Sequence, residues 1–355
     1  MKTKHSRLIR TWGIAAVVAA AGFTAACGSS KEGIAGPATP RAGEGVGNGA
    51  IPGAPAIPPK PCGPEATAAT WQGALPGPND PVPAGGTLDK IRKRGFIIVG
   101  IDLNTELFGY DPHHTNDPQG FDVDIAKQMA RAVFGASDPA HIQFRVVTLA
   151  DPKTGEYAQL HNGNVDMVVR TTTITCARMQ GDKRMSFSNP YYTAAQKLLM
   201  PLGDDGKPQP TALAQLKGRG KKVCATKNST AINTIKAQAG EDSAFEAANA
   251  LDCLALLQQD RVDAVFTDDA LLRGMEAQDP HVKITTAPPV QKQPYGIVTN
   301  YDPAKPDNDL TPFVNSVLTK MFADPGANGW RSLFANDLGM SPDSLPEIPG
   351  SYPLG

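Results

Sequence analysis

The sequence predicts an α/β protein of two lobes, with two chain crossings that form a hinge and a disordered tether in front. Short apolar runs alternate with segments of helical periodicity, which is typical of a mainly parallel sheet covered by helices. The alternation restarts after Tyr192, which indicates a second sheet. Residues 33–86 hold 12 glycines and 12 prolines and no periodic apolar pattern, so burial cannot offset the chain entropy lost on folding them.

The first lobe is expected to span residues 88–195. Its first strand is a short apolar run bounded by glycines, and its first helix places apolar residues three and four positions apart. In chain order its elements are a strand at Phe96–Ile101, a helix at Phe121–Phe134, a strand at Ile142–Val147, a helix at Tyr157–Asn162 and a strand at Val165–Arg170.

The second lobe is expected to span residues 196–293. Its elements are strands near Lys197–Met200, Lys222–Ala225, Phe245–Ala248 and Val262–Thr267, and helices at Ser229–Ala239 and Cys253–Gln259. The segment Lys292–Tyr295 has the composition of a linker. We therefore expect residues 294–345, with a strand at Gly296–Thr299 and a helix at Phe313–Phe322, to complete the first lobe, and residues 346–355 to form a tail of open role.

The first 26 residues are typical of an export signal. They carry four basic side chains and no acid, followed by the apolar run Ile14–Ala21, which is shorter than a membrane span. The small residues of Thr24–Ser30 surround Cys27 and resemble the lipobox of bacterial lipoproteins. An acylated Cys27 would anchor the chain to the outer face of the cell membrane, with residues 27–87 as anchor and tether. An ordinary cleaved signal is the alternative.

Charge and cysteine content exclude several functions. Four of the 34 basic residues belong to the signal, so 34 − 4 = 30 remain against 35 acidic ones and the mature chain is slightly acidic. It has no basic cluster, which argues against binding of a nucleic acid. No C-x-x-C motif or Cys/His cluster suggests a metal. Four cysteines besides Cys27 favour disulfides in an exported chain. Three connectivities are possible; we prefer Cys224 with Cys253, at the edges of two strands of one expected sheet, and Cys62 with Cys176.

A receptor for a free amino acid must satisfy a carboxylate and an ammonium group largely out of water. An arginine fork and a helix N-terminus suit the carboxylate, and an acidic side chain suits the ammonium. Four stretches match this chemistry in the order of a known family: Gly120–Ala126, Val165–Arg178, Phe187–Tyr192 and Val262–Asp268. They resemble solute-binding protein family 3, the amino-acid-binding proteins of ABC importers, and within it the glutamine/glutamate-binding lipoproteins of actinobacteria.

This resemblance implies a periplasmic-binding-protein-like (type II) fold that closes on its ligand, needs no cofactor, acts as a monomer and partners a membrane permease. The ligand would be glutamate, aspartate, glutamine or asparagine. The matching positions that would bind it are Arg178 for the carboxylate, Thr173 through its backbone and hydroxyl, Ser229 and Thr230 from the second lobe, Asp268 and the Thr171 backbone carbonyl for the ammonium, and Phe108, Tyr110 and Asp102 around the side chain.

Several of these positions have another interpretation. Arg178 could be a solvated loop charge, and Ser229 or Thr230 a plain helix N-cap. Asp269 competes with Asp268, since one of them is expected to cap a helix, and Phe108 or Tyr110 could belong to the core. Asn228 stands where the family commonly has glycine. Arg170, with Lys183 and Arg184, would suit an acidic ligand side chain.

Enzymes such as cyclohexadienyl dehydratases share this architecture, so the fold alone does not decide function. The sequence shows no second catalytic constellation, because His113, His114 and His161 lie in loops or at helix ends and G-x-S-x-G is absent. We therefore expect a binding protein and not an enzyme. A sensor that signals through a membrane protein would have the same binding chemistry as an importer's receptor.

Overall fold

The structure is a computed structural model that describes residues 72–341 apart from residues 112, 114, 116, 150, 152 and 302–308. The expected export signal, Cys27, most of the expected tether and the expected tail lie outside the described residues. The described part begins with turns that lead into a first helix at Thr87.

The first half of the described chain alternates strands and helices as expected. Its elements are α1 (Thr87–Arg94), β1 (Ile97–Ile101), β2 (Asn104–Thr105), β3 (Gly109–Tyr110), α2 (Phe121–Phe134), β4 (Ile142–Val146), α3 (Glu156–His161), β5 (Met167–Val168), α4 (Cys176–Met179) and β6 (Met185–Pro201). The bounds of α2 match the prediction because helix signals coincide there. Acidic residues occupy its first turn, Arg131 its last, and Gly135 ends it at a φ of 77° that suits glycine.

The second half repeats the alternation. Its elements are η2 (Leu213–Leu216), β7 (Val223–Thr226), α5 (Thr230–Gln238), η3 (Glu241–Ser243), β8 (Ala244–Ala247), α6 (Ala250–Gln258), β9 (Ala264–Asp268), α7 (Asp269–Gln278), β10 (Val282–Ile284), β11 (Lys292–Asn300), α8 (Leu310–Ala323) and α9 (Trp330–Leu338).

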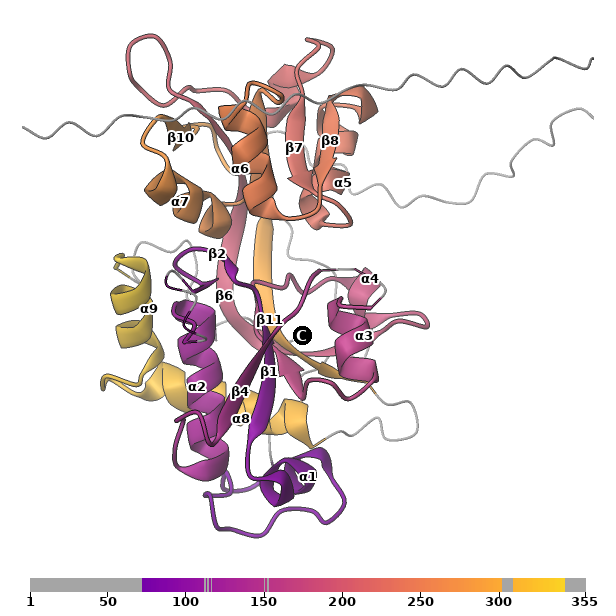
Figure 1. Ribbon diagram of the computed structural model, residues 1–355, viewed down its shortest axis with the longest axis vertical. Helices are drawn as coiled ribbons and strands as arrows, with labels where there is room; N and C mark the ends of the chain where they lie inside the picture. Colours follow the sequence, from indigo (N-terminus) through magenta and orange to yellow (C-terminus); the bar gives the residue numbers. More distant parts are fainter. Residues whose placement is uncertain are drawn as a thin grey trace, which may run out of the picture. The chain divides into compact units, whose positions relative to one another are not determined.

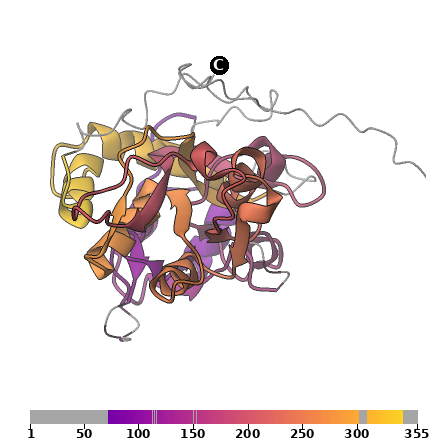
Figure 2. The same cartoon turned by 90° about the horizontal axis from the view of Figure 1, so that it is seen from above.

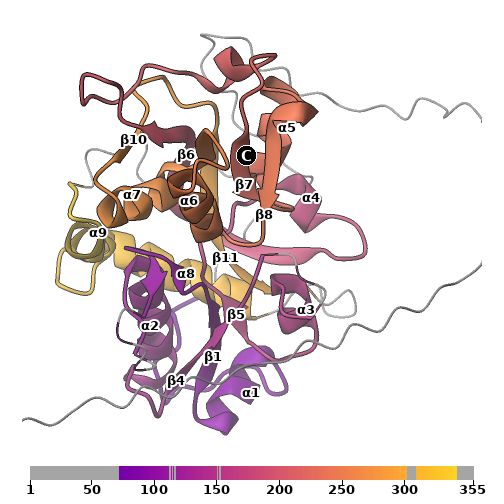
Figure 3. The same ribbon diagram turned by 45° about the horizontal axis from the view of Figure 1, so that its top comes forward.

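The described chain forms two lobes (Figure 1). In one, α1, α2, α3, α8 and α9 surround β1, β4 and β5; in the other, α5, α6 and α7 surround β7, β8, β9 and β10. Within each lobe the inner strands run parallel, β1 beside β4 and β5, and β7 beside β8 and β9. The views in Figures 2 and 3 show the helices outside and the strands between them.

Two long strands join the lobes. The sheet order is β4-β1-β5-β11-β6-β9-β7-β8, with β10 on β6, so β6 and β11 belong to both lobes. They pair antiparallel along their length, with irregularities in register on either side of Gly296 (Figure 3). The expected second sheet is present, but it is continuous with the first through β6. The expected linker at Lys292–Tyr295 was wrong, because these residues are the first four of β11.

Each lobe has a core on both faces of its strands. In the second lobe, α5 covers one face with Ile232 and Ile235, and α6 and α7 cover the other with residues such as Leu254 and Met275. In the first, α1, α2, α8 and α9 share one large core, where Trp330 donates a hydrogen bond to the Tyr191 carbonyl at 2.7 Å. No helix within the described ranges has the length and apolar character needed to cross a membrane.

Candidate functional site

A cavity lies where the carboxyl ends of the parallel strands of both lobes meet. Such ends leave loops and helix N-termini free to meet a ligand. Asp102 directly follows β1, Arg170 follows β5 and Asn249 follows β8. The full lining is Asp102, Leu149, Arg170, Thr171, Thr173 and Arg178 from the first lobe, and Thr226, Ser229, Thr230, Ala231, Ala248, Asn249, Ala250, Thr267, Asp268 and Leu271 from the second.

Arg178 brings a guanidinium with spare donors to this cavity. Thr175 caps the short helix α4 by accepting a hydrogen bond from the Arg178 N–H at 3.3 Å. The Arg178 Nη1 donates to the Thr173 carbonyl at 2.6 Å. A guanidinium carries five N–H donors, and the described part of the chain supplies no acceptor for the others.

The N-terminus of α5 faces the same cavity from the second lobe. Ser229 caps the helix by accepting a hydrogen bond from the Ile232 N–H at 3.2 Å, and Ser229, Thr230 and Ala231 all line the cavity. First-turn N–H groups have no partner within a helix and suit an anion. Asn228 has a φ of 60°, which explains why glycine can stand at this position and why asparagine is tolerated.

The threonines before Arg178 are held firmly. Thr173 is 5% exposed and forms a β-bridge with Tyr295 of β11. Thr171 has a φ of 52°, which is rare for a β-branched residue and costs energy. Its N–H donates to the Tyr191 hydroxyl at 3.2 Å, and that hydroxyl donates to buried Asp122 at 2.7 Å. The strained backbone at the cavity wall is thus fixed by a buried network.

Asp268 presents one occupied and one vacant oxygen. Its Oδ2 accepts a hydrogen bond from the Tyr295 hydroxyl at 2.7 Å, while its buried Oδ1 has no hydrogen-bond partner among the described residues. Burial raises the pKa of this carboxyl to about 7. Asp269 instead accepts from the Ala195 N–H at 2.8 Å and does not line the cavity. Asp268 is the N-cap residue of α7 by position, but its side chain makes no capping bond.

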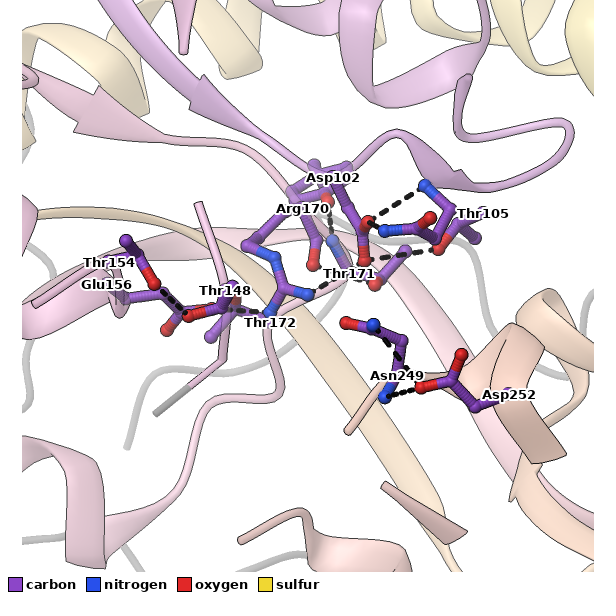
Figure 4. Close-up of polar contacts among 12 residues, drawn as sticks. Asp102, Thr105, Thr148, Thr154, Glu156, Arg170, Thr171, Thr172, Asn249 and Asp252 are labelled. Atoms are coloured by element: carbon purple, nitrogen blue, oxygen red, sulfur yellow. Dashed lines mark hydrogen bonds and ion pairs between the residues drawn. The ribbon is translucent and has the colours of Figure 1, made fainter. Parts of the chain in front are cut away.

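Arg170 lies between two carboxylates on the first-lobe side (Figure 4). Its Nη2 donates to Asp102 Oδ2 at 2.8 Å and its Nη1 to Glu156 Oε1 at 3.0 Å. The Arg170 Nε is buried and has no partner within the described residues. Figure 4 places Asn249 of the second lobe opposite this group.

Comparison with known proteins decides the family. Residues 97–328 match the bacterial extracellular solute-binding proteins, family 3. The chain belongs to this family. Family 3 proteins are extracytoplasmic and bind amino acids for ABC transporters, so the predicted family and two-lobed fold are confirmed.

Two curated relatives and one solved structure illustrate the match. The chain is 35% identical over 238 residues to the ABC transporter glutamine-binding protein GlnH of Bacillus subtilis, covering 67% of this chain and 80% of the relative. It is 26% identical over 237 residues to the glutamate-binding protein GluB of Corynebacterium glutamicum, covering 65% and 76%. A crystal structure of a mutant ArgBP from T. maritima superposes with a TM-score of 0.59 at 26% identity, covering 72% of this chain and all of that one. These curated relatives are binding proteins for transport and not enzymes.

Seven of the nine residues expected to bind ligand line the cavity of this family 3 protein; Phe108 and Tyr110 do not. Phe108 is 1% exposed in the first-lobe core, with edge-to-face contacts to Phe121 and Tyr192, so the expected contact with a ligand side chain was wrong. Tyr110 of β3 pairs with Asn104 of β2 and, through both backbone hydrogen bonds, with Gln119, and it does not line the cavity.

Sequence reasoning missed Asn249 and Glu156. Asn249 follows a parallel strand and precedes a helix, as Ser229 does, and this repeated position was the available signal. Glu156 is 1% exposed and reaches the site only through Arg170 and Thr172. No local pattern marks such an indirect contact.

The expected disulfide between Cys224 and Cys253 is present, and it ties β7 to α6 behind two loops that line the cavity. Cys176 is also disulfide-bonded, but Cys62 lies outside the described residues, so that pairing stays a prediction. Within the described ranges no group of three or more metal-ligating side chains occurs.

Proposed function

We propose that this protein captures a free amino acid with an acidic or amide side chain, namely glutamate, aspartate, glutamine or asparagine, and presents it to an ABC importer. One observation carries the proposal. The cavity brings the spare donors of Arg178 and the vacant buried oxygen of Asp268 together from opposite lobes. An α-amino acid offers a carboxylate and an ammonium, which these two groups would neutralise.

The α-carboxylate would lie between Arg178 and the first turn of α5. The arginine donates charge-assisted hydrogen bonds and the helix supplies free N–H groups. Thr173 would contribute its backbone and hydroxyl, and the Thr171 backbone carbonyl would accept a hydrogen bond from the ammonium. The ammonium would bind the vacant Oδ1 of Asp268, which removes the cost of leaving this buried oxygen without a partner.

Binding would close the lobes, because a single ligand touches both. A ligand that binds only the closed arrangement shifts the population toward it. The crossing strands β6 and β11, with irregular pairing beside Gly296, are suited to bend during such a movement. The partner in the membrane would recognise the closed form.

The place of action is also part of this proposal. We infer that Cys27 is acylated after the first 26 residues are removed, and that the following Gly/Pro-rich segment lets a monomeric receptor move over the outer membrane face. The extracytoplasmic location of the family supports this, as does the disulfide of the second lobe, since disulfides persist in oxidising compartments.

A thermal-shift screen of the purified protein against the twenty amino acids tests the function. A ligand that binds only the folded state raises the melting temperature by mass action. We expect shifts only with the four acidic and amide amino acids, followed by calorimetric titration of each. A folded protein whose melting temperature no amino acid raises would contradict the proposal.

A further inference from the structure

We propose that Arg170 is the residue that selects the ligand side chain: it requires a carbonyl or carboxylate oxygen there, and its pairing with Asp102 and Glu156 is what excludes basic amino acids. This inference rests on the proposed function, because it concerns the same cavity. Arg170 is not among the positions for which the family resemblance implied a contact with the ligand.

Most of the acceptor positions of Asp102 are occupied by neighbouring groups of the chain. Its Oδ1 accepts hydrogen bonds from the backbone N–H and the side-chain amide of Asn104, at 2.9 and 3.1 Å. Its Oδ2 accepts from Arg170 at 2.8 Å and from the Thr105 hydroxyl at 3.5 Å. An ammonium or guanidinium on a ligand side chain would therefore find this carboxylate already engaged.

Arg170, in contrast, has donors to spare. Only two of its five N–H donors have partners within the described part of the chain, Asp102 and Glu156. Its side chain is 11% exposed, so water satisfies the remaining donors poorly. A site with buried unpaired donors discriminates strongly in favour of ligands that supply an acceptor.

Glu156 fixes the position of this guanidinium. It is 1% exposed, and its Oε1 accepts both from Arg170 and from the Thr172 hydroxyl, the latter at 2.7 Å. Two anchored carboxylates hold Arg170 from two sides, and Asn249 of the second lobe, which lines the same cavity, lies across from Arg170 in Figure 4. The ligand side chain would enter there, with its oxygen toward Arg170.

The arrangement predicts a reversal of specificity. Removing the charge of Arg170 leaves Asp102 and Glu156 without their cation, and two uncompensated carboxylates attract a positive side chain. Arg170→Met should weaken binding of glutamate and glutamine by about tenfold or more, since it removes one partner of a buried charged contact. Lysine and arginine should not bind the unaltered protein and should bind this variant.

Calorimetric titration of the purified protein with glutamate, glutamine, lysine and arginine tests this. Arg145→Met is the matched control, because it removes the same charge from an exposed position on β4 outside the cavity lining, and it should keep the ranking of the unaltered protein. Asp102→Asn retains Arg170 and should still bind oxygen-bearing ligands and refuse lysine. If Arg170→Met does not fold because Glu156 has lost its partner, the double variant Arg170→Met/Glu156→Gln takes its place. The same change of ligand preference is expected.

The outcomes separate the two proposals. If the Arg170 variants bind with the ranking of the unaltered protein, or if Asp102→Asn admits lysine, the role of Arg170 is refuted while the receptor function stands. If the unaltered protein binds no amino acid, the function itself fails. Loss of oxygen-bearing ligands together with gain of basic ones supports the inference.

Discussion

Asp268 combines burial, a vacant oxygen and a titration near neutrality. Removal from water disfavours the charged form, and this desolvation raises the pKa of the Asp268 carboxyl to about 7. The neighbouring carboxylate of Asp269 acts in the same direction, while the hydrogen bond from Tyr295 and the charge of Arg178 oppose it. If the ligand ammonium binds Asp268 as proposed, it needs the ionised carboxylate, and this residue would couple ligand binding to pH.

We predict that ligand affinity falls with acidification below pH 7, by about tenfold per pH unit, as binding must then release a proton. Calorimetric titrations with the best ligand between about pH 5 and pH 8 would measure this. Asp268→Asn should bind weakly and without this pH dependence. An unaltered protein whose affinity is constant over the range would refute the assignment.

The stability of the ligand-free protein should change in the opposite direction. A carboxyl whose folded pKa is raised holds its proton more tightly in the folded state than in the unfolded state. Its contribution to stability is therefore greatest at acid pH and is lost as the pH rises toward 7. Asp122 is also buried, and desolvation raises the pKa of its carboxyl to about 7. It therefore adds to this trend.

Among single residues, the sequence predicted most of the side chains that line the cavity. Arg178, Asp268 and the threonines follow from the needs of a zwitterion and from the family motifs. Glu156 and the pairing of Asp102 with Arg170 did not follow, because 68 positions separate these two residues in the chain. For Phe108 the sequence left a core role and a ligand contact both open, since an aromatic loop residue suits either, and the structure places it in the core.

At the scale of elements, α7 approaches the first lobe at Gly274. A Cβ on this residue would lie 2.7 Å from the Glu106 carbonyl oxygen in the turn between β2 and β3, closer than such atoms approach. Helix α6 of the same lobe also contacts β2. This contact between the lobes therefore requires a glycine, although glycine weakens a helix interior.

Gly274→Ala should lower ligand affinity roughly tenfold without altering any residue of the cavity, because overpacking costs about 1–3 kcal/mol in the closed arrangement. The second lobe should not lose stability, since alanine favours the helix by about 1 kcal/mol. Calorimetry and thermal unfolding would measure both. Ala277→Ser, at an exposed position of the same helix, is the control; equal affinities in the two variants would contradict the role of this contact.

The disulfide between Cys224 and Cys253 links two elements of the second lobe. Cys224 on β7 and Cys253 on α6 lie 29 positions apart, and the loops beside them carry Ser229 and Asn249 into the cavity. Cross-linking restricts the unfolded chain, and a loop of this size corresponds to roughly 3 kcal/mol. We predict that Cys224→Ser/Cys253→Ser lowers the free energy of unfolding by about this amount in chemical denaturation. A double variant as stable as the parent would refute the estimate.

Helices and strands were predicted correctly where local sequence signals agreed, as in α2. The prediction failed where pairing between distant segments determines the structure. The 17-residue strand β6 includes Asn189 and Pro190. In the sequence these two residues were interpreted as part of a family motif and not as part of a strand. Pro294 suggested a linker, yet β11 accommodates it because its carbonyl accepts from the Ile174 N–H and antiparallel pairing with β6 continues around it. Long-range pairing of this kind leaves no periodic signal in the sequence.

For the whole molecule, the shared strands explain how two lobes can act as one receptor. The carboxyl ends of both sets of parallel strands face one cavity, while β6 and β11 alone continue from lobe to lobe in the described sheet. The expected boundaries at residues 195 and 293 fall within these two strands. A ligand held by Arg178 on one side and Asp268 on the other, as proposed, would act across the hinge.

The central claim is that Arg178 binds the carboxylate of an amino acid. Calorimetric titration tests it most directly, with the unaltered protein and Arg178→Ala each titrated with the best of the four acidic and amide amino acids. We predict one ligand per chain for the unaltered protein. Arg178→Ala should remain folded and lose several kcal/mol of binding free energy, on the order expected when a buried charge loses its partner. Binding by Arg178→Ala within about threefold of the unaltered protein would contradict the account, because such a truncation costs far more at a true carboxylate site.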